Sequence, residues 1–144
     1  METHQYNVNL KWINDRKGEI SSPELQDVIQ VATPPQFAKG IEHIWSPEHL
    51  FTAAVNSCFM TTFLSIAENS KLTFSKFTCK AIGILEKVEG KFIMSKVELF
   101  PELTLLSGLD EEKAIRILQK SEAACLISNS IKSNVSLNPA VLIA

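Results

Sequence analysis

The sequence predicts an α+β domain, because two kinds of hydrophobic pattern alternate along its 144 residues. Period-2 alternation, typical of half-buried strands, occurs at the N-terminus, across residues 73–105 and in the C-terminal tail. Helical patterns occupy two segments, at about 46–70 and 110–125. The length fits one core, so we expect a single domain covering residues 1–144.

The N-terminal segment is expected to form three short strands. Residues 5–13 alternate apolar and polar side chains, as in a half-buried strand, and residues 14–18 are typical of a turn. This places Arg16 at a hairpin tip, with the returning strand starting at Glu19. Residues 27–32 predict a further strand, which the prolines after Thr33 end because proline cannot donate to a ladder.

A long helix is predicted to begin at Ser46, because serine can cap a helix and proline suits its first position. Glu48 adds a carboxylate to the first turn, where the helix dipole favours it. The apolar residues that follow cover nearly every face up to Ser70, which predicts a buried central helix. Cys58 lies inside this helix.

Two β-rich runs, 73–88 and 91–105, are expected to form a long hairpin, since Gly90 permits the positive φ of a tight turn. Cys79 shares one face of the first run with Phe77 and Ala81, which indicates ordinary sheet packing.

A second helix is predicted after Asp110, a residue suited to cap it. Helical spacing places Cys125 on the same inward-facing stripe as Ala114 and Leu118. In the tail, residues 134–144, apolar and polar side chains alternate again, which predicts a final strand.

Charge and composition exclude several classes of protein. A net charge of −2 with scattered lysines gives no reason to expect a nucleic-acid or anionic-membrane partner. We expect no segment that reaches the ~20 apolar residues of a membrane span, and no export signal, hence a cytoplasmic protein.

The three cysteines, Cys58, Cys79 and Cys125, do not match the spacing of a zinc site, so no metal or other cofactor is expected. In a reducing cytosol, pairing between them would be transient and catalytic. Arg16 is one of only two arginines against twelve lysines. A guanidinium beside a thiol lowers the cysteine pKa, and a carboxylate can hold that guanidinium in place.

The segment that starts at Pro47-Glu48-His49-Leu50 and continues to Cys58-Phe59 resembles the reactive helix of the osmotically induced and organic hydroperoxide resistance (OsmC/Ohr) family. The later segment EEKAIRILQKSEAACLISNSI, with Cys125, is similar to the helix that carries the family's resolving cysteine. The resemblance implies an OsmC-like α+β fold, with antiparallel sheets wrapped around central helices in an intertwined homodimer.

The resemblance also implies a cysteine-based thiol peroxidase that needs no cofactor. The Cys58 thiolate would attack a hydroperoxide, preferably an organic one, and Cys125 would then close a disulfide that an external dithiol reduces. Arg16 is similar in position to the family arginine that contacts the glutamate, here Glu48, and the reactive thiol. Arg16 could act within its own chain or on the Cys58 of the partner subunit. The family commonly has glycines before this arginine and often proline after the resolving cysteine, whereas this chain has Asn14-Asp15 and Leu126.

Ten residues of unbroken helix would separate Glu48 from Cys58 by ~15 Å along the axis, too far for one guanidinium to bridge easily. Asn56 and Ser57 are both capping residues, so a second helix starting there would place Cys58 in its first turn. The alternative function is a non-catalytic dimeric module that binds a small apolar or thiol-reactive ligand in the same pocket.

Overall fold

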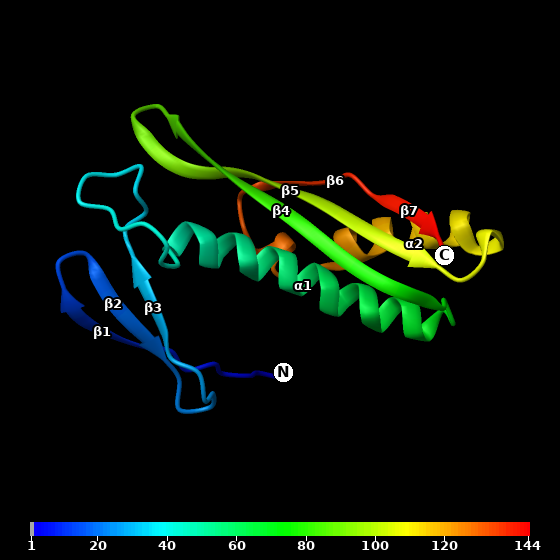
Figure 1. The fold of residues 1–144 in the computed structure, drawn as a ribbon, viewed down its shortest axis with the longest axis horizontal. Coiled ribbons are helices and arrows are strands. Elements are labelled where there is room, and N and C mark those ends of the chain that lie inside the picture. Colours follow the sequence, from blue (N-terminus) through cyan, green and yellow to red (C-terminus); the bar gives the residue numbers. More distant parts are fainter. Residues whose placement is uncertain (1) are drawn as a thin grey trace. The chain divides into compact units, whose positions relative to one another are not determined.

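The computed structural model describes residues 2–144 and divides into two compact units, the first ending at Leu50 and the second comprising Phe51–Ala144. Each unit is described by itself (Figure 1).

The first unit is built on an antiparallel three-stranded sheet. Its strands follow the order β1 (Asn9–Asn14), β2 (Lys17–Ser21) and β3 (Ile29–Ala32). The predicted turn, returning strand and third strand are confirmed, although the first strand begins at Asn9 and not at residue 5. β3 is also tied to the segment before the long helix, since Ala32 donates its N–H to the Trp45 carbonyl at 2.8 Å.

One face of this sheet is apolar and open. The Cα register aligns Leu10 with Ile20 and then Ile29, and Trp12 with Gly18 and then Val31. Leu10 and Trp12 are 72% and 73% exposed, so the prediction of a half-buried first strand is wrong for the single chain. The alternation correctly predicted a strand, but the described residues of the first unit leave its apolar side exposed.

The long helix α1 (Pro47–Asn69) begins as predicted. The Ser46 hydroxyl accepts the His49 N–H at 3.1 Å, which is the hydrogen bond of a helix cap. The predicted break at Asn56-Ser57 is wrong, because both polar side chains are engaged in other ways. Asn56 donates its carboxamide N–H to the Cys79 carbonyl at 3.0 Å, and the Ser57 hydroxyl donates back to the Ala53 carbonyl at 2.7 Å.

α1 is buried along one stripe and not on every face, contrary to the prediction. Its fully buried side chains recur four residues apart, at Val55, Phe59, Phe63 and Ala67. Met60 and Leu64 remain 39% and 41% exposed. By length and mean hydropathy (1.5) α1 does reach the threshold for a membrane span, against the sequence expectation. Its buried stripe belongs to the core cluster of the second unit.

The second unit contains the predicted hairpin, β4 (Phe74–Val88) and β5 (Lys91–Leu105). Glu89 and Gly90 join the strands with φ of 51° and 81°, the positive values that a two-residue hairpin turn requires. Gly83 of β4 faces α1, where an added Cβ would collide with the Thr52 hydroxyl. A residue without a side chain at this position therefore lets the helix approach the sheet closely.

The tail forms two strands and not one. β6 (Asn134–Leu137) and β7 (Ala140–Ile143) both run parallel to β5 (Figure 1). The gap between them contains Asn138-Pro139 and falls opposite Phe100-Pro101 of β5. Because proline has no N–H to donate, the ladder is interrupted there and resumes after it.

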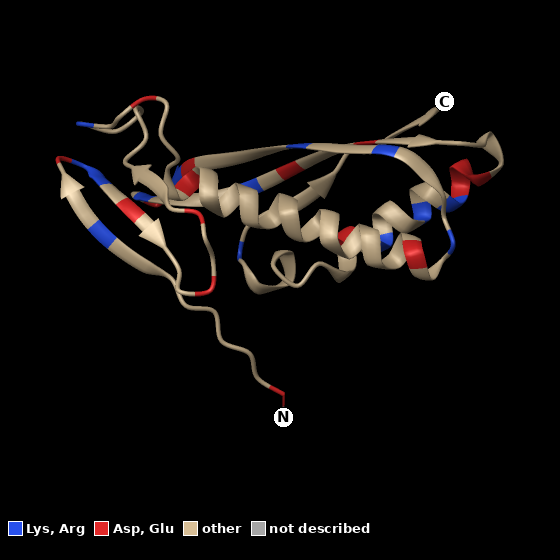
Figure 2. Cartoon of the chain, turned by 60° about the horizontal axis from the view of Figure 1, so that its bottom comes forward, with Lys and Arg blue, Asp and Glu red and all other residues tan. Residues whose placement is uncertain are grey.

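The second helix, α2 (Glu111–Ala124), lies on the same side of the sheet as α1 (Figure 2). Asp110 precedes it but makes no side-chain capping hydrogen bond, so that prediction is wrong. The chain already turns in a 3-10 helix, Gly108–Asp110, where the Ser107 hydroxyl accepts the Leu109 N–H. Buried side chains of α1, β5 and α2 form the core of this unit (Val55, Phe59, Phe63, Ala67, Val97, Leu99, Leu103, Leu105, Ala114, Ile117 and Leu118).

Candidate functional site

Cys58 is presented by α1 next to its buried stripe. Phe59 is fully buried, whereas Cys58 is only partly buried. One turn further along the helix, the Thr62 hydroxyl lies 4.0 Å from the Cys58 sulfur. Because α1 is continuous, Cys58 lies in mid-helix, and the dipole of a helix start makes no contribution at its thiol.

Cys125 is the first residue after α2 and not a residue within it. Its backbone is extended, with φ −65° and ψ 118°, and its side chain is completely buried as predicted. The segment that follows is tightly folded. The Asn129 carboxamide donates to the Ala123 carbonyl at 3.0 Å, and the Asn129 N–H donates to the Cys125 carbonyl at 3.0 Å.

The two cysteines are neighbours in the second unit, close enough for each thiol to affect the pKa of the other. Burial tends to raise the pKa of Cys58, but hydrogen bonds outweigh burial and hold that pKa below its ordinary value. These bonds come from the Cys125 thiol, the Ile127 N–H, the Thr62 hydroxyl and the Leu126 N–H. Donors to a sulfur favour its anion, so Cys58 is the more acidic thiol.

Cys125 has the opposite tendency. Burial raises its pKa, and the neighbouring Cys58 raises it further, both as a hydrogen-bond acceptor and as a negative charge. The neighbouring Ser128 offsets only part of this increase. When the pair loses one proton, Cys58 therefore becomes the thiolate and Cys125 remains its S–H donor. This arrangement supplies a nucleophile with a second thiol near it.

Cys79 is separate from this pair. It packs against the core from β4, and burial raises its pKa to about 11. Its thiol is therefore almost entirely protonated at neutral pH, which agrees with the predicted role in sheet packing.

Arg16 lies in the turn between β1 and β2, exposed to solvent, and belongs to the first unit. The turn is fixed from both sides. The Trp12 indole donates to the Asp15 carbonyl at 3.0 Å, and the Thr33 N–H donates to the Arg16 carbonyl at 3.3 Å. A pocket of about 240 Å³ opens beside it, lined by Arg16, Lys17 and apolar residues that include Leu10 and Trp12.

Glu48 is half-buried in the first turn of α1, also within the first unit, and its Oε1 atom is buried. The structure thus brings together the two predicted cysteines. The contact of Arg16 and Glu48 with the thiol stays a prediction.

Several groups at the cysteine pair were not identified from the sequence. Thr62 could have been found, because it lies four residues after Cys58 on the same helix face. The N–H groups of Leu126 and Ile127 could not, because every residue except proline has one, and only the path of the chain directs it at the sulfur.

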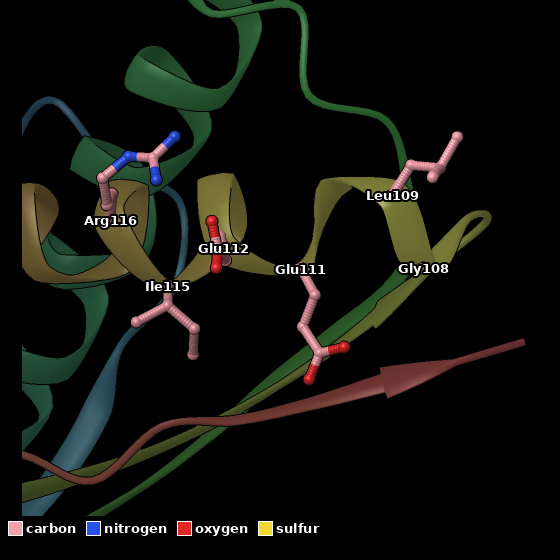
Figure 3. A pocket seen from close by; sticks show the side chains of 6 residues that line it. All are labelled: Gly108, Leu109, Glu111, Glu112, Ile115 and Arg116. Atoms are coloured by element: carbon pink, nitrogen blue, oxygen red, sulfur yellow. The ribbon is translucent and has the colours of Figure 1, made fainter.

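A second hollow, of about 780 Å³, lies at the beginning of α2 (Figure 3). Glu111, Glu112 and Arg116 give it charges of both signs, and Ile115 and Leu109 add apolar walls. Figure 3 shows Arg116 and Ile115 on different sides of the helix. Cys125 follows the other end of α2, so this hollow is distinct from the cysteine pair.

Comparison with known proteins identifies the family. Residues 40–139 match the OsmC-like protein family. The chain belongs to the OsmC-like family. The matched region contains both cysteines of the pair and most of the two-layer second unit, so the resemblance stated from the sequence is confirmed.

Relatives of this OsmC-like chain include proteins with and without an assigned activity. It is 23% identical over 140 residues to the uncharacterised protein YmaD of Bacillus subtilis, covering 95% of this chain and 93% of YmaD. It is 28% identical over 93 residues to the peroxiredoxin OsmC of Escherichia coli, covering 65% of this chain and 64% of that protein.

Solved structures share the fold. An OsmC-like protein of unknown function from Vibrio cholerae, VCA0330, superposes with a TM-score of 0.86 at 23% identity, covering 95% of this chain and 99% of its own. An organic hydroperoxide resistance protein from Legionella pneumophila superposes with a TM-score of 0.75 at 23% identity, covering 97% and 99%. The OsmC-like α+β fold is therefore confirmed.

Proposed function

We propose that this OsmC-like chain is a thiol peroxidase that reduces organic hydroperoxides through Cys58 and Cys125. The observation that carries the proposal is the proximity of two thiols with opposite pKa shifts, lowered for Cys58 and raised for Cys125. Nucleophilic attack requires a thiolate, and resolution requires a second thiol within reach. Family membership supports the same chemistry, since the E. coli relative is named a peroxiredoxin.

The reaction proceeds in two steps. The Cys58 thiolate attacks the terminal oxygen of the hydroperoxide, the O–O bond breaks, and the alkoxide leaves and takes up a proton to become an alcohol. Cys58 is then a sulfenic acid. The Cys125 sulfur attacks the Cys58 sulfur, its proton accompanies the departing oxygen as water, and a disulfide forms. An external dithiol returns two electrons and two protons and completes the cycle.

Arg16 and Glu48 are proposed to act on this reaction as a pair. A guanidinium at the thiol stabilises the anion, and a carboxylate aligns the guanidinium through bidentate hydrogen bonds. The rigid turn around Arg16 supports such a role, because the Trp12 and Thr33 hydrogen bonds restrict its backbone.

We further propose a homodimer. The open apolar face of β1 to β3 and the exposed Met60 and Leu64 of α1 are surfaces that a second copy would cover. Light scattering after size exclusion measures the mass directly, and a monomer would refute the dimer without touching the peroxidase assignment.

The decisive experiment follows the consumption of cumene hydroperoxide, tert-butyl hydroperoxide and hydrogen peroxide with a dithiol reductant. We expect turnover of the organic peroxides by the wild type, none by Cys58→Ser, and full turnover by the control Cys79→Ser. Mass spectrometry after peroxide treatment should identify a Cys58–Cys125 disulfide. If the wild type consumes none of the three peroxides, the enzyme assignment fails and a module that binds a small apolar or thiol-reactive ligand becomes the better description.

A further inference from the structure

α1 runs alongside β4 and contacts it on successive turns (Figure 1). The Thr52 hydroxyl lies where a side chain on Gly83 would be, and Asn56 follows one turn later. The Asn56 carboxamide donates to the Cys79 carbonyl at 3.0 Å. The residue opposite Cys79 in β5 is Pro101, which has no N–H to donate. Asn56 therefore supplies a donor to a strand carbonyl that the opposite residue cannot pair.

Further along, α1 and β4 meet through aromatic rings. The Phe63 ring stacks on Phe77 with centroids 4.7 Å apart and lies 5.4 Å from Phe74. The Phe59 ring lies 6.2 Å from Phe77. Burial of apolar surface has no fixed direction, so these contacts allow the helix some freedom to slide and turn. A hydrogen bond is directional, and the one from Asn56 therefore restricts both movements.

The Asn56 carboxamide is only half satisfied. Its Oδ1 atom is buried and accepts no hydrogen bond from the residues that the structure describes. A buried acceptor without a donor has a desolvation penalty that outweighs the small net gain from one neutral hydrogen bond. An apolar side chain of similar size would therefore be at least as stable here. The direction that Asn56 gives to α1 explains a polar residue at this position better than stability does.

Cys58 follows Asn56 by two residues, which corresponds to about 200° around the helix. A bond from Asn56 to β4 therefore directs Cys58 to the other side of α1, where the Thr62 hydroxyl lies 4.0 Å from its sulfur. We propose that Asn56 is a positioning residue, whose hydrogen bond to β4 sets the rotation and axial position of α1 and so the place of the Cys58 thiol. The inference rests on the proposed peroxidase function and adds to it a residue outside the reacting groups.

Three variants separate positioning from stability. Asn56→Leu removes the carboxamide and keeps a side chain of similar size. Asn56→Gln keeps the N–H donors on a longer side chain. Ser57→Ala is the matched control, because the Ser57 hydroxyl donates to carbonyl groups of its own helix, those of Ala53 and Ala54.

The first measurement is the rate of Cys58 alkylation by iodoacetamide against pH, with mass spectrometry to assign the site. It uses the reduced Cys79→Ser background, which keeps the main-chain carbonyl that Asn56 binds. In Asn56→Leu we expect the midpoint of this profile to rise by about half a unit to one unit, because a displaced thiolate loses hydrogen bonds that favour it. Asn56→Gln should restore most of the midpoint, and Ser57→Ala should leave it unchanged.

The second measurement is turnover of cumene hydroperoxide with a dithiol reductant. Misplacement of a nucleophile affects the chemical step more than binding of the substrate. In Asn56→Leu we therefore expect kcat to fall about tenfold or more while KM changes little. Ser57→Ala should again match the wild type.

Urea denaturation is the third measurement. The unfolding midpoint of Asn56→Leu should equal or exceed that of the wild type, a result that a purely stabilising hydrogen bond would not give. An unchanged alkylation profile in folded Asn56→Leu would overturn the positioning role. A lower urea midpoint, together with an altered profile that Asn56→Gln does not restore, would also overturn it, because the change would then reflect a less stable unit.

The positioning role and the enzyme assignment can fail separately, because alkylation needs no peroxide. A shifted alkylation profile in Asn56→Leu, in a protein whose wild type consumes no peroxide, would support the positioning role and refute the enzyme. An unshifted profile in an active enzyme would do the reverse.

Discussion

Two regions of the second unit each contain a cysteine on a core-facing element, and their surroundings produce opposite chemistry. Cys58 on α1 meets a thiol, a hydroxyl and two N–H groups, and its pKa is lowered. Cys79 on β4 packs against the hydrophobic core, and burial raises its pKa to about 11 although the Phe100 N–H acts to lower it. Both residues are partly buried cysteines, and Cys79 packs more closely against the core. The difference teaches that the donors facing a sulfur, and not burial alone, decide which cysteine becomes a nucleophile.

The largest expected effect is the difference in alkylation rate between the two thiols. A pKa of about 11 leaves roughly one Cys79 in ten thousand as thiolate at pH 7, so Cys79 should react slowest. We expect iodoacetamide to label Cys58 first, as measured by peptide mass spectrometry over time. Alkylation in denaturant, where the cysteines become equivalent, is the control. Faster labelling of Cys79 in the native protein would reverse the comparison.

The second effect concerns the packing that keeps Cys79 on the core. The Phe63 ring of α1 stacks on Phe77 of β4, with centroids 4.7 Å apart and planes at 13°. Phe63→Ala should cost about 3–5 kcal/mol of unfolding free energy, because it leaves a cavity between helix and sheet.

The matched control is Phe63→Leu, which retains most of the volume and should cost much less. Urea denaturation measures both variants. Alkylation of Cys79 should accelerate in Phe63→Ala, because a less stable unit opens more often. A loss below 1 kcal/mol would show that this stack does not hold β4 against α1.

The surroundings of these two cysteines also show which features of a fold a sequence can predict. The Ser46 cap and the positive φ at Gly90 were predicted correctly, because each depends on a few adjacent residues. The break at Asn56-Ser57 was wrong for the opposite reason. Asn56 is committed to the carbonyl of Cys79, 23 residues away, and no local pattern reveals that contact.

Part of the candidate site could also be predicted from the sequence. The cysteine pair followed from motif spacing, and the structure brings the pair together. The exposure of Leu10 and Trp12 was not predicted, since alternation shows that a strand has an apolar face and not what covers it. The donors of the turn after Cys125 depend on backbone direction, which residue identity does not encode.

A third effect is the pH dependence of stability, whose sign should differ between the two cysteines. The lowered pKa of Cys58 means that ionisation favours the folded state, so this contribution is present above the unfolded pKa of the thiol and is lost as pH falls through the folded value. The raised pKa of Cys79 means that stability is lost as pH rises from the unfolded pKa towards 11.

Thermal denaturation between pH 6 and pH 10 would measure these contributions as differences from the wild type. Relative to the wild type, the melting temperature of Cys58→Ser should decrease as the pH increases. The melting temperature of Cys79→Ser should increase relative to the wild type over the same range. Parallel curves for both variants would mean that the two thiols titrate alike in the folded protein, which contradicts the comparison.

The smallest effect is expected at Thr62, whose hydroxyl lies 4.0 Å from the Cys58 sulfur. A contact of this length is weak, so Thr62→Val should raise the Cys58 pKa by about a few tenths of a unit. Thr62→Ser keeps the hydroxyl and should restore the wild-type value, which separates the hydrogen bond from the loss of a β-branched shape. Alkylation against pH in the Cys79→Ser background measures both. If Thr62→Val raises the pKa by about one unit or more, the Thr62 hydroxyl is a main partner of the thiolate, and the contrast with Cys79 would depend largely on α1.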